Sequence, residues 1–384
     1  MVLRGHFVAT VIGATALSAV GLSSSVQLAD ADPQAGSSAG APTAVLSGRD
    51  TVTNDYFGTC VAISGDVLVA GSYGHGSGAG AAYVFTKTST GWEQTAELEG
   101  SGTTAGDHFG AYVAISGDLI AVSALGHAAS PSRVYLFQRS AVGWHQVAEL
   151  EGSGPAERGF GGETAISGST IVVGGDESVY VFAKTATGWD QTATLKGSDT
   201  VAKDGFGYFG GLAISGHTVV VGAMGHASSA GRTYVFAQTG TSWKQAAELE
   251  SAGTLAGDHF GANIAISGPT LVASDLPDPT GPSLPGAYVF SHTAAGWRQT
   301  AKLAVPFGVG GDVAIAGKTI ALAGTSVYVF TGSPSGWRQT AKLNDPTPGA
   351  DDGFGVSIAM SGNTVAVGAQ TAAKSAGRVY VYQV

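Results

Sequence analysis

The chain has 384 residues, of which 60 are glycine, 12% are charged and 44% are hydrophobic. This composition suits a large all-β domain with many short strands, and the formal net charge of −10 argues against nucleic acid, which needs a basic surface. Cys60 is the single cysteine, which excludes a framework of intrachain disulfides. We therefore expect a core that is held by packing alone and no nucleic-acid partner.

The N-terminus has the features of a secretory signal peptide. Phe7–Leu22 is an apolar run, and Ala29–Ala31 offers small residues for cleavage. A retained membrane anchor is the less favoured alternative, because the run is shorter than the roughly 20 apolar residues that span a bilayer. We predict a signal peptide over residues 1–31, a flexible leader over 32–42 and a secreted mature chain without a membrane span.

One unit recurs along the rest of the chain, and each copy begins with a Phe-Gly pair 46 to 54 residues after the previous one. The pairs begin at Phe57, Phe109, Phe160, Phe206, Phe260, Phe307 and Phe354. An Ala-Ile-Ser-Gly type turn, an apolar run and a Tyr-x-Phe segment follow each pair, and six copies add a Trp-x-Gln segment. A period in this range indicates a repeat architecture.

Each unit contains four short strands separated by turns, which is typical of a β-propeller blade. The last unit ends at Val384 after its third strand, whereas Thr43–Gly48 copies the fourth-strand segment Thr95–Gly100. Pairing this orphan strand with the last unit would remove two exposed sheet edges. We therefore predict an all-β, seven-bladed β-propeller over residues 43–384, with four-stranded antiparallel blades and an N-terminal strand that closes the ring in the last blade.

This pattern resembles the FG-GAP repeat, the module of the integrin α-subunit head and of many secreted bacterial proteins. The resemblance covers nearly all of the mature chain and implies an extracellular binding protein. Integrin-type blades bind calcium in an Asp-rich loop between the first two strands, but that connection is a bare turn here, as at Ser64–Asp66. Such a turn cannot supply the roughly six to eight oxygen ligands of Ca²⁺. In this respect the pattern resembles the bacterial branch of the family more than the integrin branch. We therefore expect no calcium and no other cofactor.

An aspartate stands two residues before the Phe-Gly pair in five units: Asp55, Asp107, Asp204, Asp258 and Asp352. Arg158 and Val305 replace it in the other two. Because aspartate can hydrogen-bond to the backbone two residues further on, we interpret these residues as turn-fixing. The alternative is a ring of carboxylates that attracts a cation to the channel mouth.

Five histidines map to loops on one face of the predicted propeller: His75, His127 and His226 between second and third strands, and His108 and His259 before first strands. They could form a pH-sensitive or metal-binding surface. Copied repeats also share residues without sharing a function, and most blades lie far apart around the ring, so we predict no metal. The candidate ligand-binding residues on this face are Tyr73, the five histidines, and Asp275 and Asp278 in the proline-rich loop Asp275–Pro285.

The sequence contains no nucleophile elbow, zinc-protease motif or phosphate loop. We therefore expect a monomeric, non-catalytic scaffold that presents this face to an unknown extracellular protein or matrix. One alternative is a glycan-binding propeller lectin, which aromatic residues such as Tyr73 or Tyr112 between blades would favour. The other is an enzyme with a site at the channel mouth. Extra residues at Tyr208–Gly211 and Val309–Asp312 predict bulges near the channel.

Overall fold

The computed structural model describes residues 28–29, 37–38, 40–126, 131–153, 159–175, 177–208, 211–276, 286–306, 311–347 and 352–384. Most of the predicted signal peptide and leader lies outside the described residues. The same is true of His127, Arg158, Asp278 and Phe307, of most of the loop Asp275–Pro285, and of residues 209–210 and 309–310 in the two predicted bulges.

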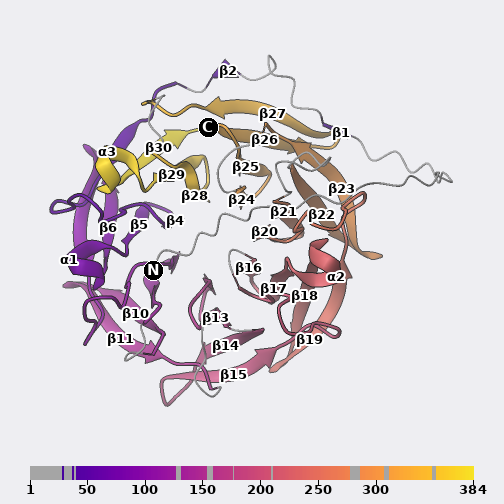
Figure 1. Cartoon of the computed structure of the whole chain (residues 1–384), viewed down its shortest axis with the longest axis horizontal. Coiled ribbons are helices and arrows are strands. Elements are labelled where there is room, and N and C mark those ends of the chain that lie inside the picture. Colours follow the sequence, from indigo (N-terminus) through magenta and orange to yellow (C-terminus); the bar gives the residue numbers. More distant parts are fainter. Residues whose placement is uncertain are drawn as a thin grey trace, which may run out of the picture.

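Seven antiparallel sheets are arranged around a central axis like the blades of a propeller (Figure 1). In blades 1 to 6 the four strands follow one another from the axis to the rim in chain order. Blade 1 contains β4 (Val61–Ser64), β5 (Val67–Ser72), β6 (Ala81–Thr88) and β7 (Gly91–Leu98). Blade 2 contains β8 (Val113–Ser116), β9 (Leu119–Ala124), β10 (Arg133–Ser140) and β11 (Gly143–Leu150). Blade 3 contains β12 (Thr164–Ser167), β13 (Thr170–Gly175), β14 (Ser178–Lys184) and β15 (Trp189–Leu195).

The next three blades repeat this order. Blade 4 contains β16 (Leu212–Ser215), β17 (Thr218–Ala223), β18 (Arg232–Thr239) and β19 (Ser242–Leu249). Blade 5 contains β20 (Asn263–Ser267), β21 (Thr270–Ser274), β22 (Gly286–Thr293) and β23 (Gly296–Ala304). Blade 6 contains β24 (Val313–Ala316), β25 (Thr319–Ala323), β26 (Val327–Ser333) and β27 (Gly336–Leu343). Two short strands, β1 (Leu28–Ala29) and β2 (Ser37–Ser38), run parallel to β23 and β27.

Blade 7 joins the two ends of the chain and confirms the predicted closure. It contains β28 (Phe354–Ser361), β29 (Thr364–Ala369), β30 (Arg378–Gln383) and, as its outer strand, β3 (Ala44–Leu46). β3 runs antiparallel to β30 with Val45 opposite Tyr380, and the Thr43 N–H donates to the Val381 carbonyl at 2.7 Å. The ring therefore closes through backbone hydrogen bonds between segments more than 330 residues apart.

The core consists of wedges between blades. In the described part of the chain, each of seven clusters of buried side chains draws on two neighbouring blades. The cluster between blades 7 and 1, for example, combines Leu46, Phe57 and Tyr83 with Val379 and Val381. Each blade therefore needs both neighbours to bury its two faces, which explains why one cooperative ring forms and not a set of independent sheets.

The repeated aromatic residues pack together within each wedge. The Phe-Gly phenylalanine is buried in the six blades where it is described and packs on the two aromatic rings of the third strand. Phe57 meets the Tyr83 ring edge to face, with centroids 5.6 Å apart. Gly71 in the second strand of blade 1 lies against Gly110, the Phe-Gly glycine of blade 2. A Cβ on Gly71 would overlap the Gly110 carbonyl oxygen. The motif thus encodes contact between blades as well as a turn.

The Ala-Ile-Ser-Gly turns have the positive φ predicted for their glycines, between 55° and 59° at Gly65 and its six counterparts. Their serines have a second function. In six of the seven blade junctions the serine hydroxyl accepts the glycine N–H of the next blade at 2.9 to 3.2 Å. The junction from blade 6 to blade 7 has Ala316 in place of the serine.

Adding the missing serine–glycine hydrogen bond between blades 6 and 7 should stabilise the protein. We expect Ala316→Ser to raise the free energy of unfolding by about 0.5 kcal/mol, the contribution of one exposed hydrogen bond, and Ser215→Ala to lower it by a similar amount. Urea unfolding followed by tryptophan fluorescence measures both changes. Equal destabilisation by the two substitutions would contradict the proposed role of the serine ring.

Candidate functional site

The propeller has two chemically different faces. The loop face is formed by the loops that join second to third strands and those that lead into first strands, such as 73–80 and 47–60 in blade 1. The turn face carries the short connections such as 65–66 and 89–90. Neighbouring loops of the loop face contact one another through backbone hydrogen bonds. The His108 backbone N–H, for example, donates to the Gly78 carbonyl at 2.8 Å. His259 donates in the same way to Ser229.

Three of the loops between second and third strands form a single turn of helix that contains left-handed residues: α1 (His75–Gly78), α2 (His226–Ser229) and α3 (Ala372–Ser375). Two central residues of α1, Gly76 and Ser77, have φ near 60°. The non-glycine residues Ala227 and Ser228 occupy the same region in α2. Left-handed backbone is unfavourable for residues with a Cβ, and such strain is concentrated at functional sites.

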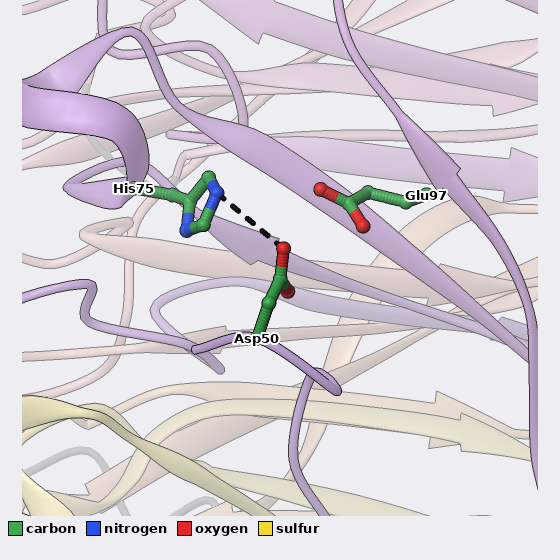
Figure 2. Close-up of side chains that lie close together, drawn as sticks. All are labelled: Asp50, His75 and Glu97. Carbon is green, nitrogen blue, oxygen red and sulfur yellow. Dashed lines mark ion pairs between the residues drawn. The ribbon is translucent and has the colours of Figure 1, made fainter. Parts of the chain in front are cut away.

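His75 and two carboxylates form a cluster on this face of blade 1 (Figure 2). His75 Nε2 lies 3.7 Å from Asp50 Oδ2, and the ligand atoms of Asp50, His75 and Glu97 all lie within 4.8 Å of one another. Asp50 comes from the loop after β3, His75 from α1 and Glu97 from β7. Closure of the ring by β3 therefore positions one member of the cluster.

Two buried groups orient this cluster. Asp55, which is 3% exposed, accepts a hydrogen bond from His75 Nδ1 at 2.8 Å, and the Tyr83 hydroxyl donates to Asp50 Oδ1 at 2.8 Å. Burial opposes protonation of the imidazole, but the hydrogen bond and charge of Asp55 outweigh it and raise the pKa of His75. Burial and then the charge of Asp50 raise the pKa of Glu97. The cluster thus collects negative charge around one imidazole.

Blade 4 repeats the arrangement with Asp199, His226 and Glu248. His226 Nδ1 lies 2.8 Å from Asp204, its Nε2 lies 3.6 Å from Asp199, and the Tyr234 hydroxyl donates to Asp199 at 2.8 Å. In this blade Arg232 also binds Glu248, with its Nε 3.1 Å from Oε1. The corresponding residue of blade 1 is Ala81, so Glu97 has no such arginine.

Tyrosine rings lie beside the blade 1 cluster. Tyr56 and Tyr73 stack with their centroids 5.0 Å apart and their planes at 2°, and both are half-buried. The His108 imidazole meets Tyr73 edge to face at 5.7 Å. The structure therefore brings together three predicted site residues, Tyr73, His75 and His108, on blades 1 and 2. His226 and His259 lie in adjacent loops of blades 4 and 5, which are joined by the bond from the His259 backbone N–H to the Ser229 carbonyl.

Asp275, another predicted ligand-binding residue, points into blade 5. It is 1% exposed and accepts hydrogen bonds from the Gly286 N–H at 2.6 Å and the Tyr288 hydroxyl at 3.1 Å. Lys302, at the position of Glu97, lies over the Tyr288 ring. Burial raises the pKa of Asp275 to about 6, although the Gly286 hydrogen bond and the Lys302 charge lower it. These contacts make Asp275 part of the support of its loop.

The recurring aspartates hydrogen-bond to the backbone of their own loops, as expected for a structural role. In four of the five, however, the bond is to an earlier residue and not to the one two positions further on. Asp55, Asp107, Asp204 and Asp258 each accept the backbone N–H of the residue three positions earlier. Asp352 alone shows the expected bond, from the Phe354 N–H two residues further on, at 3.2 Å. In blades 1 and 4 the same carboxylate also holds the histidine of the cluster.

The central channel contains a cavity of about 470 Å³ near its mouth. Its lining includes Cys60, Tyr112, Glu163 and Asp312, which places the last residue of one predicted bulge beside the channel. Burial, with the Glu163 charge, raises the pKa of the Cys60 thiol to about 12. Burial also raises the pKa of Asp312 to about 6, against hydrogen bonds from the Ile358 and Val313 N–H groups. A thiol held in its protonated form is a poor nucleophile at neutral pH.

Sequence reasoning missed Asp50 and Glu97 as partners of His75. A signal was present in the internal repeats, because blades 1 and 4 share aspartate, histidine and glutamate at the three positions. Blade 2 instead has Gly102 at the first position, and blade 5 has Lys302 at the third. Comparing which repeats share all three residues would have separated this cluster from residues that are only copied.

The architecture and the repeated unit define a seven-bladed β-propeller that is assembled from Phe-Gly repeats. The FG-GAP repeat model matches residues 42–85, 92–137, 189–236 and 337–382. The chain therefore contains FG-GAP repeats, which the family model detects at four places along it. Comparison with curated protein sequences finds no match. The helices in the described part of the chain are too short to cross a membrane.

Solved structures share the fold at low sequence identity. A chain in the crystal structure of the mitotic checkpoint complex is 14% identical, with a TM-score of 0.59 over 98% of this chain and 99% of that one. The β-propeller domain of Cps50 (Swd1) from Myceliophteria thermophila is 13% identical, with a TM-score of 0.58 over 89% of this chain and all of that one. The RRP9 WD40 repeats are 11% identical, with a TM-score of 0.57 over 90% of this chain and all of that one. These likenesses show the fold alone.

The buried carboxyl group of Asp275 predicts a pH effect. Its raised pKa means that the protonated form stabilises the fold, fully below about pH 4, and that this contribution is lost as the pH rises through about 6. Asp275→Asn keeps an acceptor for Gly286 and does not ionise. Relative to the unchanged protein, the variant should gain roughly 1–3 kcal/mol of unfolding free energy between about pH 4 and about pH 7.5. Denaturant unfolding at both pH values tests this, and an equal difference at both would contradict it.

Proposed function

We propose that this FG-GAP propeller is a secreted, non-catalytic binding scaffold that presents its loop face to an extracellular protein or matrix ligand. The observation that carries this proposal is the set of exposed apolar side chains on that face. Val52, Val201 and Leu255 stand at equivalent positions in the loops of blades 1, 4 and 5 and are 62%, 65% and 53% exposed. Exposed apolar side chains at the same position of several loops offer apolar contact area to a partner.

The blade 1 sector adds side chains suited to recognition. Tyr56, Tyr73 and His108 form a connected aromatic group on the same face as Val52 and the Asp50 cluster. Tyrosine is enriched at binding interfaces because its ring contributes apolar area while its hydroxyl can hydrogen-bond. The strained left-handed turns of the loop face support the same assignment. The turn face, with two-residue connections, offers little to shape a specific site.

Location and chemistry complete the proposal. The predicted signal peptide and the FG-GAP family both favour an extracellular site of action. The short turns between first and second strands favour a scaffold without integrin-type calcium, and the protonated Cys60 thiol in the channel favours a non-catalytic role. We propose that the propeller acts as a monomer, because the ring buries both faces of every blade within one chain.

Substitution on the two faces tests the proposal. The double variant Val52→Ser with Tyr73→Ala should reduce capture of the ligand from the native extracellular medium by about tenfold, since hot-spot side chains dominate binding. Val142→Ser is the matched control, because Val142 is 96% exposed on the turn face. Affinity capture with quantitative mass spectrometry measures the effect, and thermal unfolding verifies that both variants fold. Loss of capture by the control alone would contradict the assignment of the binding face.

A carbohydrate ligand is the second candidate, favoured by the stacked, half-buried Tyr56 and Tyr73 rings. Flat aromatic surfaces with polar tips suit ligands that have both apolar and hydroxyl faces. A glycan array would distinguish the two candidates. Strong, competable binding of one sugar that Tyr73→Ala abolishes would identify a lectin, whereas an array without binding would leave the protein or matrix ligand.

A further inference from the structure

The Asp50, His75 and Glu97 side chains have the donor set of a metal site. We propose that these three residues bind a divalent transition-metal ion, with zinc as the reference ion, on the loop face of blade 1. The proposal goes beyond the binding of a macromolecular ligand and does not depend on it. From the sequence, histidines of different blades were expected to lie too far apart to share a metal. In the structure, His75 instead lies beside the carboxylates of Asp50 and Glu97.

The distances suit a single ion. Zinc binds imidazole nitrogen and carboxylate oxygen at roughly 2.0–2.2 Å, so tetrahedral ligand atoms lie about 3.4 Å apart. His75 Nε2 and Asp50 Oδ2 are 3.7 Å apart, and the ligand atoms of all three residues lie within 4.8 Å of one another. Asp50 and Glu97 are exposed, so their side chains can move the small remaining distance. Three protein ligands leave a further coordination position for water or a ligand group.

The buried partners orient two of the three ligands. Histidine ligands usually donate their other ring N–H to a carboxylate, which fixes the tautomer and strengthens the ligand. Asp55 provides this contact at 2.8 Å from His75 Nδ1, so the lone pair of neutral His75 lies on Nε2, toward Asp50. The Tyr83 hydroxyl engages Asp50 Oδ1 and leaves Oδ2 for the ion. The supporting contacts are therefore in place without the metal.

The charges around the cluster also favour a cation. Asp50, Asp55, Glu97 and Glu99 all act on this site, and no arginine or lysine among the described residues forms an ion pair with Asp50 or Glu97. A divalent ion would compensate these negative charges.

The other blades serve as internal comparisons. Blade 4 has the same three ligands and the same two supporting contacts, but Arg232 already binds Glu248. Blade 5 has Lys302 in place of the glutamate and Asp275 within its interior. The blade 1 cluster should therefore be the tighter site and the blade 4 cluster a weaker one.

The donor types define the class of metal. One imidazole nitrogen with two carboxylate oxygens suits zinc, nickel, copper or cobalt, whereas Ca²⁺ prefers roughly six to eight oxygens and Mg²⁺ an oxygen octahedron. This site also differs in place from the calcium loops of integrin-type blades, because those connect first and second strands and would lie on the turn face.

Zinc titration of the full chain without a histidine tag tests the proposal by isothermal titration calorimetry. We expect one tight site and one weaker site. His75→Ala and Glu97→Lys should each weaken the tight site by more than about tenfold, because loss of even an outer-shell partner typically costs about 10- to 100-fold in metal affinity. Glu97→Lys copies the residue of blade 5 and changes an exposed position, so the fold should persist. Arg232→Ala should strengthen the weak site by freeing Glu248.

His108→Ala is the matched control, because His108 lies on the same face and outside the cluster. It should leave both zinc affinities unchanged, and thermal unfolding without metal confirms that each variant is folded. Three results would overturn the proposal: no zinc binding by the unchanged chain, equal zinc affinity in Glu97→Lys, or a loss in His108→Ala as large as in His75→Ala.

Discussion

The antiparallel pairing of β3 with β30 is the contact on which the rest of the structure depends. It joins the start of the propeller to its end through backbone hydrogen bonds, and it places Leu46 in the wedge between blades 7 and 1. Without it, the first and last blades would each lose a buried face, and two sheet edges would be exposed. The same strand leads directly into the loop that carries Asp50 and Asp55, so closure of the ring also sets the geometry of the blade 1 cluster.

Each motif of the repeat contributes a contact between neighbouring blades. The Phe-Gly phenylalanine fills the wedge, the strand glycine admits the backbone of the next blade, and the turn serine binds the following glycine. Cooperativity follows from this arrangement, since no blade satisfies these groups alone. The loops are less constrained, and there blades 1, 2, 4 and 5 differ in the charge of a few residues. The blades therefore share a common frame and differ in the charge of a few loop residues.

The sequence was sufficient to predict the seven blades, their strand order and the closing strand, because each depends on a pattern copied in every unit. It was also sufficient to place His75 and His108 on one face. It could not reveal that Asp50 and Glu97 face His75, because these residues come from a loop and an outer strand whose side chains meet only after folding. The interior position of Asp275 was equally hidden, since a proline-rich loop gives no sign that its first carboxylate turns inward to Tyr288. The serine contacts across blades were missed because a turn motif explains serine without a partner.

Hydrogen exchange of the closing strand tests ring closure most directly. Mass spectrometry can follow the peptide that contains Ala44–Leu46 and the peptide that contains β30 in the same experiment. If the ring closes as described, the amides of the closing strand exchange only through global unfolding, as slowly as those of β30. Exchange of Ala44–Leu46 at the rate of an unstructured segment, with β30 still protected, would contradict the account.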